Sequence, residues 1–172
     1  MSNLTVFPDM FAALRADGPE LSLASELSLF GQFVGAWDLE IDFWPRDESA
    51  WSTNGVWLFD WILDGRGIQD VILHTSARGQ VGRGTTVRLY DPVAQLWRMA
   101  FFGPISRTYV MLTARQDGDS ILVEGRERDD LLRWSFHDIT PNSFLWRGHI
   151  SADEGSTWHY EQEMRARRRG PK

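Results

Sequence analysis

The chain has 172 residues, of which 42% are hydrophobic, and carries a formal net charge of -6 with a pI near 5.2. This acidic balance argues against nucleic acid as a partner, because no basic field is present to displace counterions from phosphates. The sequence has no apolar run of membrane-spanning length, no secretory signal and no cysteine, so we expect no membrane insertion, no disulfides and a cytoplasmic location.

The first part of the chain predicts two helices. A short one is expected over Asp9–Ala16, after an extended entry that starts at Leu4, and Asp17-Gly18-Pro19 ends it. A second is expected from Glu20 to Phe33, because Leu23, Leu27, Phe30 and Val34 recur at helical spacing. Residues 1–33 therefore form a helical extension, whose role as a plug, a lid or a dimer contact is left open.

A strongly patterned strand follows. Trp37, Leu39, Ile41 and Phe43 alternate with Asp38, Glu40 and Asp42, which places the apolar side chains on one face and the carboxylates on the other. Such a half-buried strand needs partners. We expect it to open a β domain over residues 34–169, followed by a tail at 170–172.

Nine more short runs separated by turn residues read as strands. They span Trp51–Leu63, Ile68–His74, Thr85–Tyr90, Leu96–Phe102, Arg107–Ala114, Ile121–Arg126, Leu131–Phe136, Phe144–Ser151 and Trp158–Arg168. A long loop is expected over Thr75–Gly84. About ten strands at this spacing predict an all-β fold, an antiparallel up-and-down barrel.

The aromatic content, 13% of the chain with nine tryptophans, indicates either a packed core or an aromatic-lined cavity. Residues in phase along their strands are candidates for the ligand-binding wall: Trp57, Phe59, Trp61, Tyr90, Trp97, Met99, Phe101, Met111, Trp146 and Trp158. Apolar walls with few polar groups are typical of sites for small hydrophobic ligands.

Four polar residues are candidates for catalysis. Asp70 and His74 share one strand face and could exchange protons with a ligand, while Tyr109 or Arg88 could orient an oxygen. The opposite strand phase, with Val71 and Leu73 buried and the pair in water, fits the pattern equally well. The other histidines, His137, His149 and His159, are poorly phased for the interior.

Several common site motifs are missing from the sequence. The histidines and carboxylates do not have metal-ligand spacing, so no metal is expected. A Gly-x-Ser-x-Gly elbow, a phosphate-binding glycine loop and a dinucleotide fingerprint are also absent.

Gly35-Ala36-Trp37 after a short helix, followed by meandering strands and an arginine-rich last strand, resembles the calycin superfamily of lipocalins and fatty-acid-binding proteins. The segments FVGAWDLEI, WILDGRG, GTTVRLYDP and RWSFHDITPNSFLWRG are similar to a bacterial calycin-like family of unknown function. The resemblance covers Leu27–Arg168. It implies a structural pair at the closed end of the barrel, Trp37 under an arginine of the last strand, either Arg168 or Arg165.

Three functions follow as expectations. The first is binding of a small hydrophobic molecule, aromatic or polycyclic, inside the barrel without a cofactor. The second is a cofactor-independent isomerase, cyclase or lyase that acts on such a molecule by acid/base chemistry. The third is a haem-binding barrel, as in the nitrobindin branch of the superfamily. A homodimer is left open.

Overall fold

The computed structural model describes residues 9–170. Two short helices, α1 (Met10–Leu14) and α2 (Ala24–Gly31), come first, with a 3-10 turn at Leu21–Leu23 between them. The second expected helix is therefore shorter than predicted and starts with a tighter turn, while the expected extended entry at Leu4 lies outside the described residues.

Ten strands follow within the described residues, as the turn spacing predicted. They are β1 (Gly35–Phe43), β2 (Trp51–Ile62), β3 (Gly67–Thr75), β4 (Val81–Asp91), β5 (Leu96–Gly103), β6 (Thr108–Asp117), β7 (Ser120–Glu127), β8 (Asp130–His137), β9 (Ser143–Ser151) and β10 (His159–Arg168). β3 ends at Thr75 and β4 begins at Val81, so the loop expected over Thr75–Gly84 is shortened to residues 76–80.

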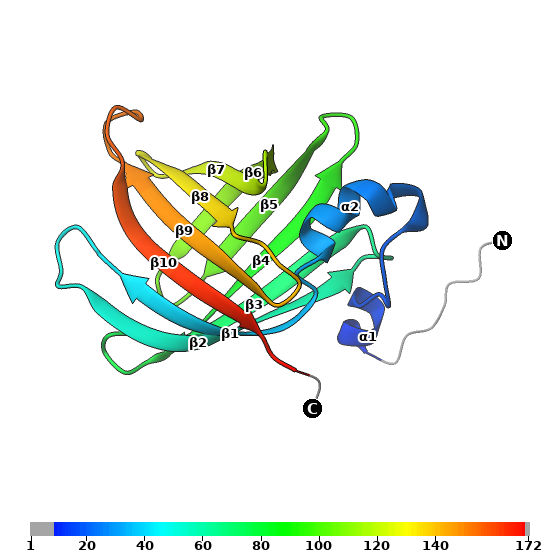
Figure 1. Ribbon diagram of the computed structural model, residues 1–172, viewed down its shortest axis with the longest axis horizontal. Helices are drawn as coiled ribbons and strands as arrows, with labels where there is room; N and C mark the ends of the chain where they lie inside the picture. Colours follow the sequence, from blue (N-terminus) through cyan, green and yellow to red (C-terminus); the bar gives the residue numbers. More distant parts are fainter. Residues whose placement is uncertain (1–8, 171–172) are drawn as a thin grey trace.

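The strands close into an antiparallel barrel in which each pairs with its sequence neighbours and β1 pairs with β10 (Figure 1). In the closing seam Trp37 lies opposite Arg168 and Ile41 opposite Met164. Closure leaves no unpaired strand edge, which removes the usual route to edge-to-edge aggregation. The predicted fold class is confirmed.

The alternation of β1 is realised as expected. Trp37, Leu39 and Ile41 are buried inside the barrel, and the carboxylates of β1 lie outside, where Arg165 and Arg169 pair with them. The arginine-rich last strand is thus mainly the ionic partner of the acidic first strand. These exposed ion pairs contribute little individually.

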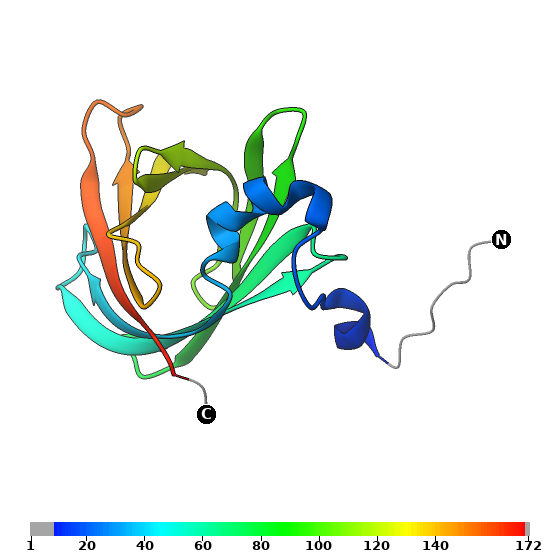
Figure 2. The same ribbon diagram turned by 45° about the vertical axis from the view of Figure 1, so that its right-hand side comes forward.

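One end of the barrel is filled by aromatic side chains from α2 and the residues after it. Figure 2 shows α2 lying across the ring of strands. Phe30 packs on Trp97, and Phe33 on Phe136 and Phe144, at centroid separations of 4.8–5.0 Å. We call Phe30 and Phe33 with the rings around them the aromatic plug. It closes this end and confines open space to the other half of the barrel.

The residues of the Gly-x-Trp motif meet Arg168 at the plugged end, as the resemblance implied. The Arg168 guanidinium lies 4.1 Å from the Trp37 ring centre and donates hydrogen bonds to the carbonyls of Gln32, Val34 and Pro141. Gly35 has φ +126°, and a Cβ there would lie 2.8 Å from Arg168 Nη1. The motif therefore needs glycine both for its backbone angle and for space.

Candidate functional site

A cavity of about 500 Å³ occupies the half of the barrel away from the plug. Its apolar lining is provided by Phe43, Trp51, Trp57, Ile72, Phe101, Leu132, Trp134, Trp146 and Met164. Most of these rings come from different strands, because each strand sends alternate side chains inward. The cavity opens toward the loops that contain Ser76 to Gln80 and Ile105 to Ser106.

A buried ion pair lies at the inner end of this cavity, against the plug. Asp70 and Arg88, exposed by only 1% and 2%, pair through Oδ2 and Nη1, and Asp70 Oδ1 accepts the backbone N–H of Thr86 at 3.1 Å. The guanidinium also lies 5.2 Å from the ring of Phe30 and 5.3 Å from that of Phe59. Both charges are removed from water, so each charged side chain needs the other to offset the free-energy cost of its burial.

Buried N–H donors without partners also border the cavity. Arg88 Nε, Trp57 Nε1 and Trp134 Nε1 have no hydrogen-bond partner within residues 9–170. All three residues line the same cavity. A buried donor that lacks an acceptor costs about 1–3 kcal/mol, so such groups are strong attachment points for acceptor atoms.

His74 lies at the mouth, on the same inward face of β3 as Asp70. Its ring is 5.6 Å from Phe43 and 6.4 Å from Trp51. The inward phase of Asp70, Ile72 and His74 is thus the one the structure adopts. Four residues of strand separate Asp70 and His74 by roughly 13 Å, so they act at opposite ends of the cavity and not as an acid/base couple.

A bulge in β10 brings the carboxyl of Glu161 into the cavity lining. The pairing with β9 shifts between Tyr160 and Gln162, and the extra residue sends both Glu161 and Gln162 inward. Burial raises the pKa of Glu161, and the nearby Glu127 and Asp130 raise it further, whereas His159 and Arg46 lower it. Sequence reasoning missed Glu161 because strict alternation cannot reveal a bulge.

The candidate wall residues fall into three groups. Trp57, Phe101 and Trp146 line the cavity. The second group packs in the core around the plug: Phe59, Trp61, Trp97, Met99 and the partly buried Tyr90. The third group, Met111 and Trp158, lies outside the cavity lining, as does Tyr109, the residue expected to orient an oxygen.

Tyr109 and Met111 point outward, with 60% and 69% of their surfaces exposed. Cross-strand partners share a face, and Trp97 and Met99 of β5 face inward opposite Ala114 and Leu112. This register turns Val110, Leu112 and Ala114 of β6 inward. The sequence could not distinguish the two faces because both are apolar.

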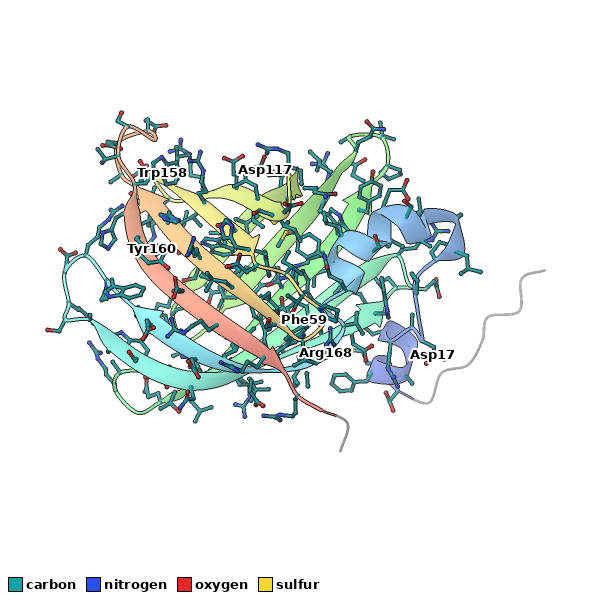
Figure 3. The ribbon with its side chains drawn as sticks, in the orientation of Figure 1. Asp17, Phe59, Asp117, Trp158, Tyr160 and Arg168 are labelled. Carbon is teal, nitrogen blue, oxygen red and sulfur yellow. The ribbon has the colours of Figure 1, made fainter. Side chains whose placement is uncertain are left out.

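Trp158 lies outside because of the bulge in β10. The extra residue reverses the alternation before Gln162, so Trp158 and Tyr160 lose the phase of Met164. Trp158 instead stacks on the exposed Arg133, 4.2 Å from its ring, at the opposite end of β10 from Arg168 (Figure 3).

The aromatic wall residues that sequence reasoning missed are Phe43, Trp51 and Trp134. Phe43 continues the buried alternation of β1, and Trp134 continues that of Leu132 and Phe136 in β8. Both signals were present in the sequence. Trp51 stacks on Phe43 at 4.1 Å and joins the wall through that ring.

Three histidines lie outside the cavity lining. His137 and His149 border a groove on the outer face of β7 to β10, and burial lowers the pKa of both, as does the charge of Arg147. His159 contacts the carbonyl of Trp44 at 2.6 Å. Among residues 9–170, no three His, Asp or Glu side chains are grouped to hold a metal ion, and no helix is long and apolar enough to cross a membrane.

Comparison with known proteins shows the fold. The S-type phycobiliprotein lyase CPES from Guillardia theta matches with a TM-score of 0.61 and 13% identity, over 90% of this chain and 100% of that chain. Rv2717c from M. tuberculosis matches with a TM-score of 0.65 and 12% identity, over 84% and 98%. No family model and no curated protein matches the sequence. The likeness extends to the fold: the chain forms a closed antiparallel β-barrel similar to these two structures.

Proposed function

We propose that the protein binds a small, largely hydrophobic molecule, aromatic or polycyclic, inside the barrel. The observation that carries this is the aromatic-lined cavity of about 500 Å³ in the open half of the barrel, within the range of about 300–1,000 Å³ usual for ligand sites. A packed core would have filled this half as the plug fills the other. Membership of the bacterial calycin-like family is part of the proposal.

A neutral fluorescent dye, N-phenylnaphthylamine, tests binding directly. We expect its emission to rise on titration with an affinity in the micromolar range, about -8 kcal/mol. Ile72→Trp fills the cavity and should weaken binding about tenfold or more, whereas Val71→Trp, on the outer face of the same strand, should not. Equal affinities in the two variants would place the dye outside the barrel and refute the proposal.

The second candidate function is acid/base catalysis on the same type of molecule. Glu161 favours it, because burial in the cavity raises the pKa of this carboxyl and makes its carboxylate a stronger base than that of an exposed glutamate. One structural neighbour carries the name lyase, so the fold is used by a protein named as an enzyme. Asp70 is less suited to this role because Arg88 and Thr86 occupy its oxygens.

Nitrobenzisoxazole provides a general test of a base in an apolar cavity. A base removes the ring C–H proton while the N–O bond breaks, which releases a coloured cyanophenolate. We expect turnover above buffer that Glu161→Gln abolishes and Glu163→Gln, an outward carboxylate on the same strand, leaves unchanged. Identical rates in Glu161→Gln and wild type would exclude this residue as the base.

The haem alternative depends on His74 as the cavity-lining histidine, with Arg78 and Arg83 at the same mouth as partners for carboxylates. A haemin titration should then give a Soret band that His74→Ala removes. A homodimer stays a proposal as well. The exposed apolar side chains of the outer face, Leu58, Phe102, Tyr109 and Met111, are its most suitable contact surface.

A further inference from the structure

The inner end of the cavity has more buried donors than acceptors. Arg88 is 2% exposed and Trp57 is 4% exposed, and within residues 9–170 neither Arg88 Nε nor Trp57 Nε1 has a hydrogen-bond partner. Both side chains lie against Phe59, Trp57 at 4.9 Å between ring centres and Arg88 at 5.3 Å. Two side chains with unpartnered N–H groups thus lie near one ring at the inner end of the site.

The formal charge at this end is already balanced. Asp70 neutralises Arg88, and its other oxygen accepts the Thr86 N–H. A ligand carboxylate that reached Arg88 would therefore lie beside the Asp70 carboxylate in a desolvated site, where like charges repel strongly. A neutral oxygen can accept the same hydrogen bonds without that repulsion.

We propose that the inner end of the cavity takes an uncharged oxygen acceptor, the carbonyl of an aryl ketone, quinone or lactone, through Arg88 and Trp57, and that Asp70 discriminates against carboxylates. This rests on the proposed binding function and names the class of ligand and its orientation. The oxygen enters first, and the aromatic body lies between Phe101, Trp134 and Trp146.

Three probes with one ring system test this selectivity: naphthalene, acetylnaphthalene and naphthoate. Each is titrated against the N-phenylnaphthylamine complex, and displacement gives its affinity. In the wild-type protein acetylnaphthalene should bind about tenfold tighter than naphthalene, the gain expected from hydrogen bonds to a buried charged donor. It should also bind at least about tenfold tighter than naphthoate.

Two variants separate the roles of the pair. Asp70→Asn removes the repelling charge, so naphthoate should gain about tenfold or more while acetylnaphthalene changes little. Arg88→Met combined with Asp70→Leu replaces the buried pair by apolar residues, a change that proteins commonly tolerate, and should reduce the preference for acetylnaphthalene over naphthalene to what Trp57 alone supports. Asp91→Asn, which disrupts the exposed pair of Asp91 with Arg98, is the control and should leave all three affinities unchanged.

The outcomes separate this inference from the function on which it rests. If neither the dye nor any probe binds, both are wrong. If the probes bind but naphthalene equals acetylnaphthalene, or naphthoate binds best, the binding function stands and the oxygen-acceptor site is refuted. The wild-type comparison needs no variant, so a substitution that fails to fold still leaves a decisive result.

Discussion

At the scale of single residues, Arg168 links the start of the barrel to its end. Its guanidinium covers the fully buried Trp37 and donates to three backbone carbonyls, those of Gln32, Val34 and Pro141. These carbonyls belong to segments far apart in the sequence. Burial lowers the pKa of Arg168, so the charge has lost part of its hydration and depends on these acceptors.

Arg168→Met should lower the free energy of unfolding by about 2–4 kcal/mol, because it removes the charged hydrogen bonds and the cation–π contact while retaining the side-chain length. Arg168→Lys should rescue little of this, since an ammonium cannot reproduce the fork of donors. Urea denaturation measures both. Arg167→Met, at the exposed neighbouring position, should change stability by less than about 0.5 kcal/mol.

The success of sequence reasoning at this scale depended on how strongly each residue's neighbours constrain it. Trp37 lies in a strict alternation that only one phase can bury. The pattern around Asp70 and His74 left two phases open, and the structure adopts the inward one. The pairing of Asp70 with Arg88 did not follow, because it is set by strand register. Trp158 was misplaced because a bulge lies between it and the rest of β10.

At the scale of elements, β10 shows how a single inserted residue changes the site. The bulge places Glu161 in the cavity and Glu163 outside, two residues apart, with opposite effects on their acidities. The pKa of Glu161 is raised from 4.5, chiefly by burial. Burial also opposes ionisation of Glu163, but hydrogen bonds from Tyr160, Arg147 and Arg165 outweigh it and lower its pKa.

The two carboxyls should therefore affect stability with opposite signs. Glu161 holds its proton more tightly in the folded protein, so it disfavours folding increasingly as the pH rises above the unfolded value of 4.5. Glu161→Gln should raise Tm at about pH 8 and have no effect at about pH 4, below that unfolded value. Thermal melts across this range measure the difference.

Glu163→Gln is the matched substitution on the same strand. Its carboxylate stabilises the folded protein above the unfolded pKa of 4.5, and this contribution is lost as the pH falls through the lower folded value. The variant should therefore lower Tm at about pH 8 and converge with wild type in acid. A lower Tm for Glu161→Gln than for wild type at neutral pH would contradict its placement in a desolvated wall.

The strands differ in how far their sequences determine the inward face. β1 has carboxylates on one side, so its phase is unambiguous, whereas β6 offers Tyr109 and Met111 on one face and Val110, Leu112 and Ala114 on the other. Register with β5 decides, and it places the small Ala114 opposite the bulky Trp97. Such volume matching between strands is a property of the folded barrel and has no local sequence signal.

At the scale of the whole molecule, the barrel combines a solid half and a hollow half within one ring of hydrogen-bonded strands. The number of strands and the closure of β1 on β10 were predictable because turn residues recur at regular spacing. The position of the cavity was not, because Phe30 and Phe33 of the plug and the wall tryptophans have the same apolar character in the sequence. The plug phenylalanines come from α2 and the residues after it, whereas the wall tryptophans come from strands, and this difference in position distinguishes core residues from cavity-lining ones.

This architecture predicts that a ligand in the hollow half stabilises the entire barrel. Each strand is bonded to two neighbours, so the ring should unfold in one transition, and a molecule bound only to the folded state raises its stability everywhere. At a free concentration of N-phenylnaphthylamine about one hundred times its Kd, the gain is about 2.7 kcal/mol. For a chain of this length that corresponds to a rise in Tm of roughly 5–11 °C.

Ile72→Trp should show almost none of this shift, whereas Val71→Trp should show all of it. The dye could instead fluoresce with the protein and leave Tm unchanged at saturation. It would then bind the folded and the unfolded chain equally well. Such binding is typical of exposed apolar surface, and it would contradict binding in a cavity that exists only in the folded barrel.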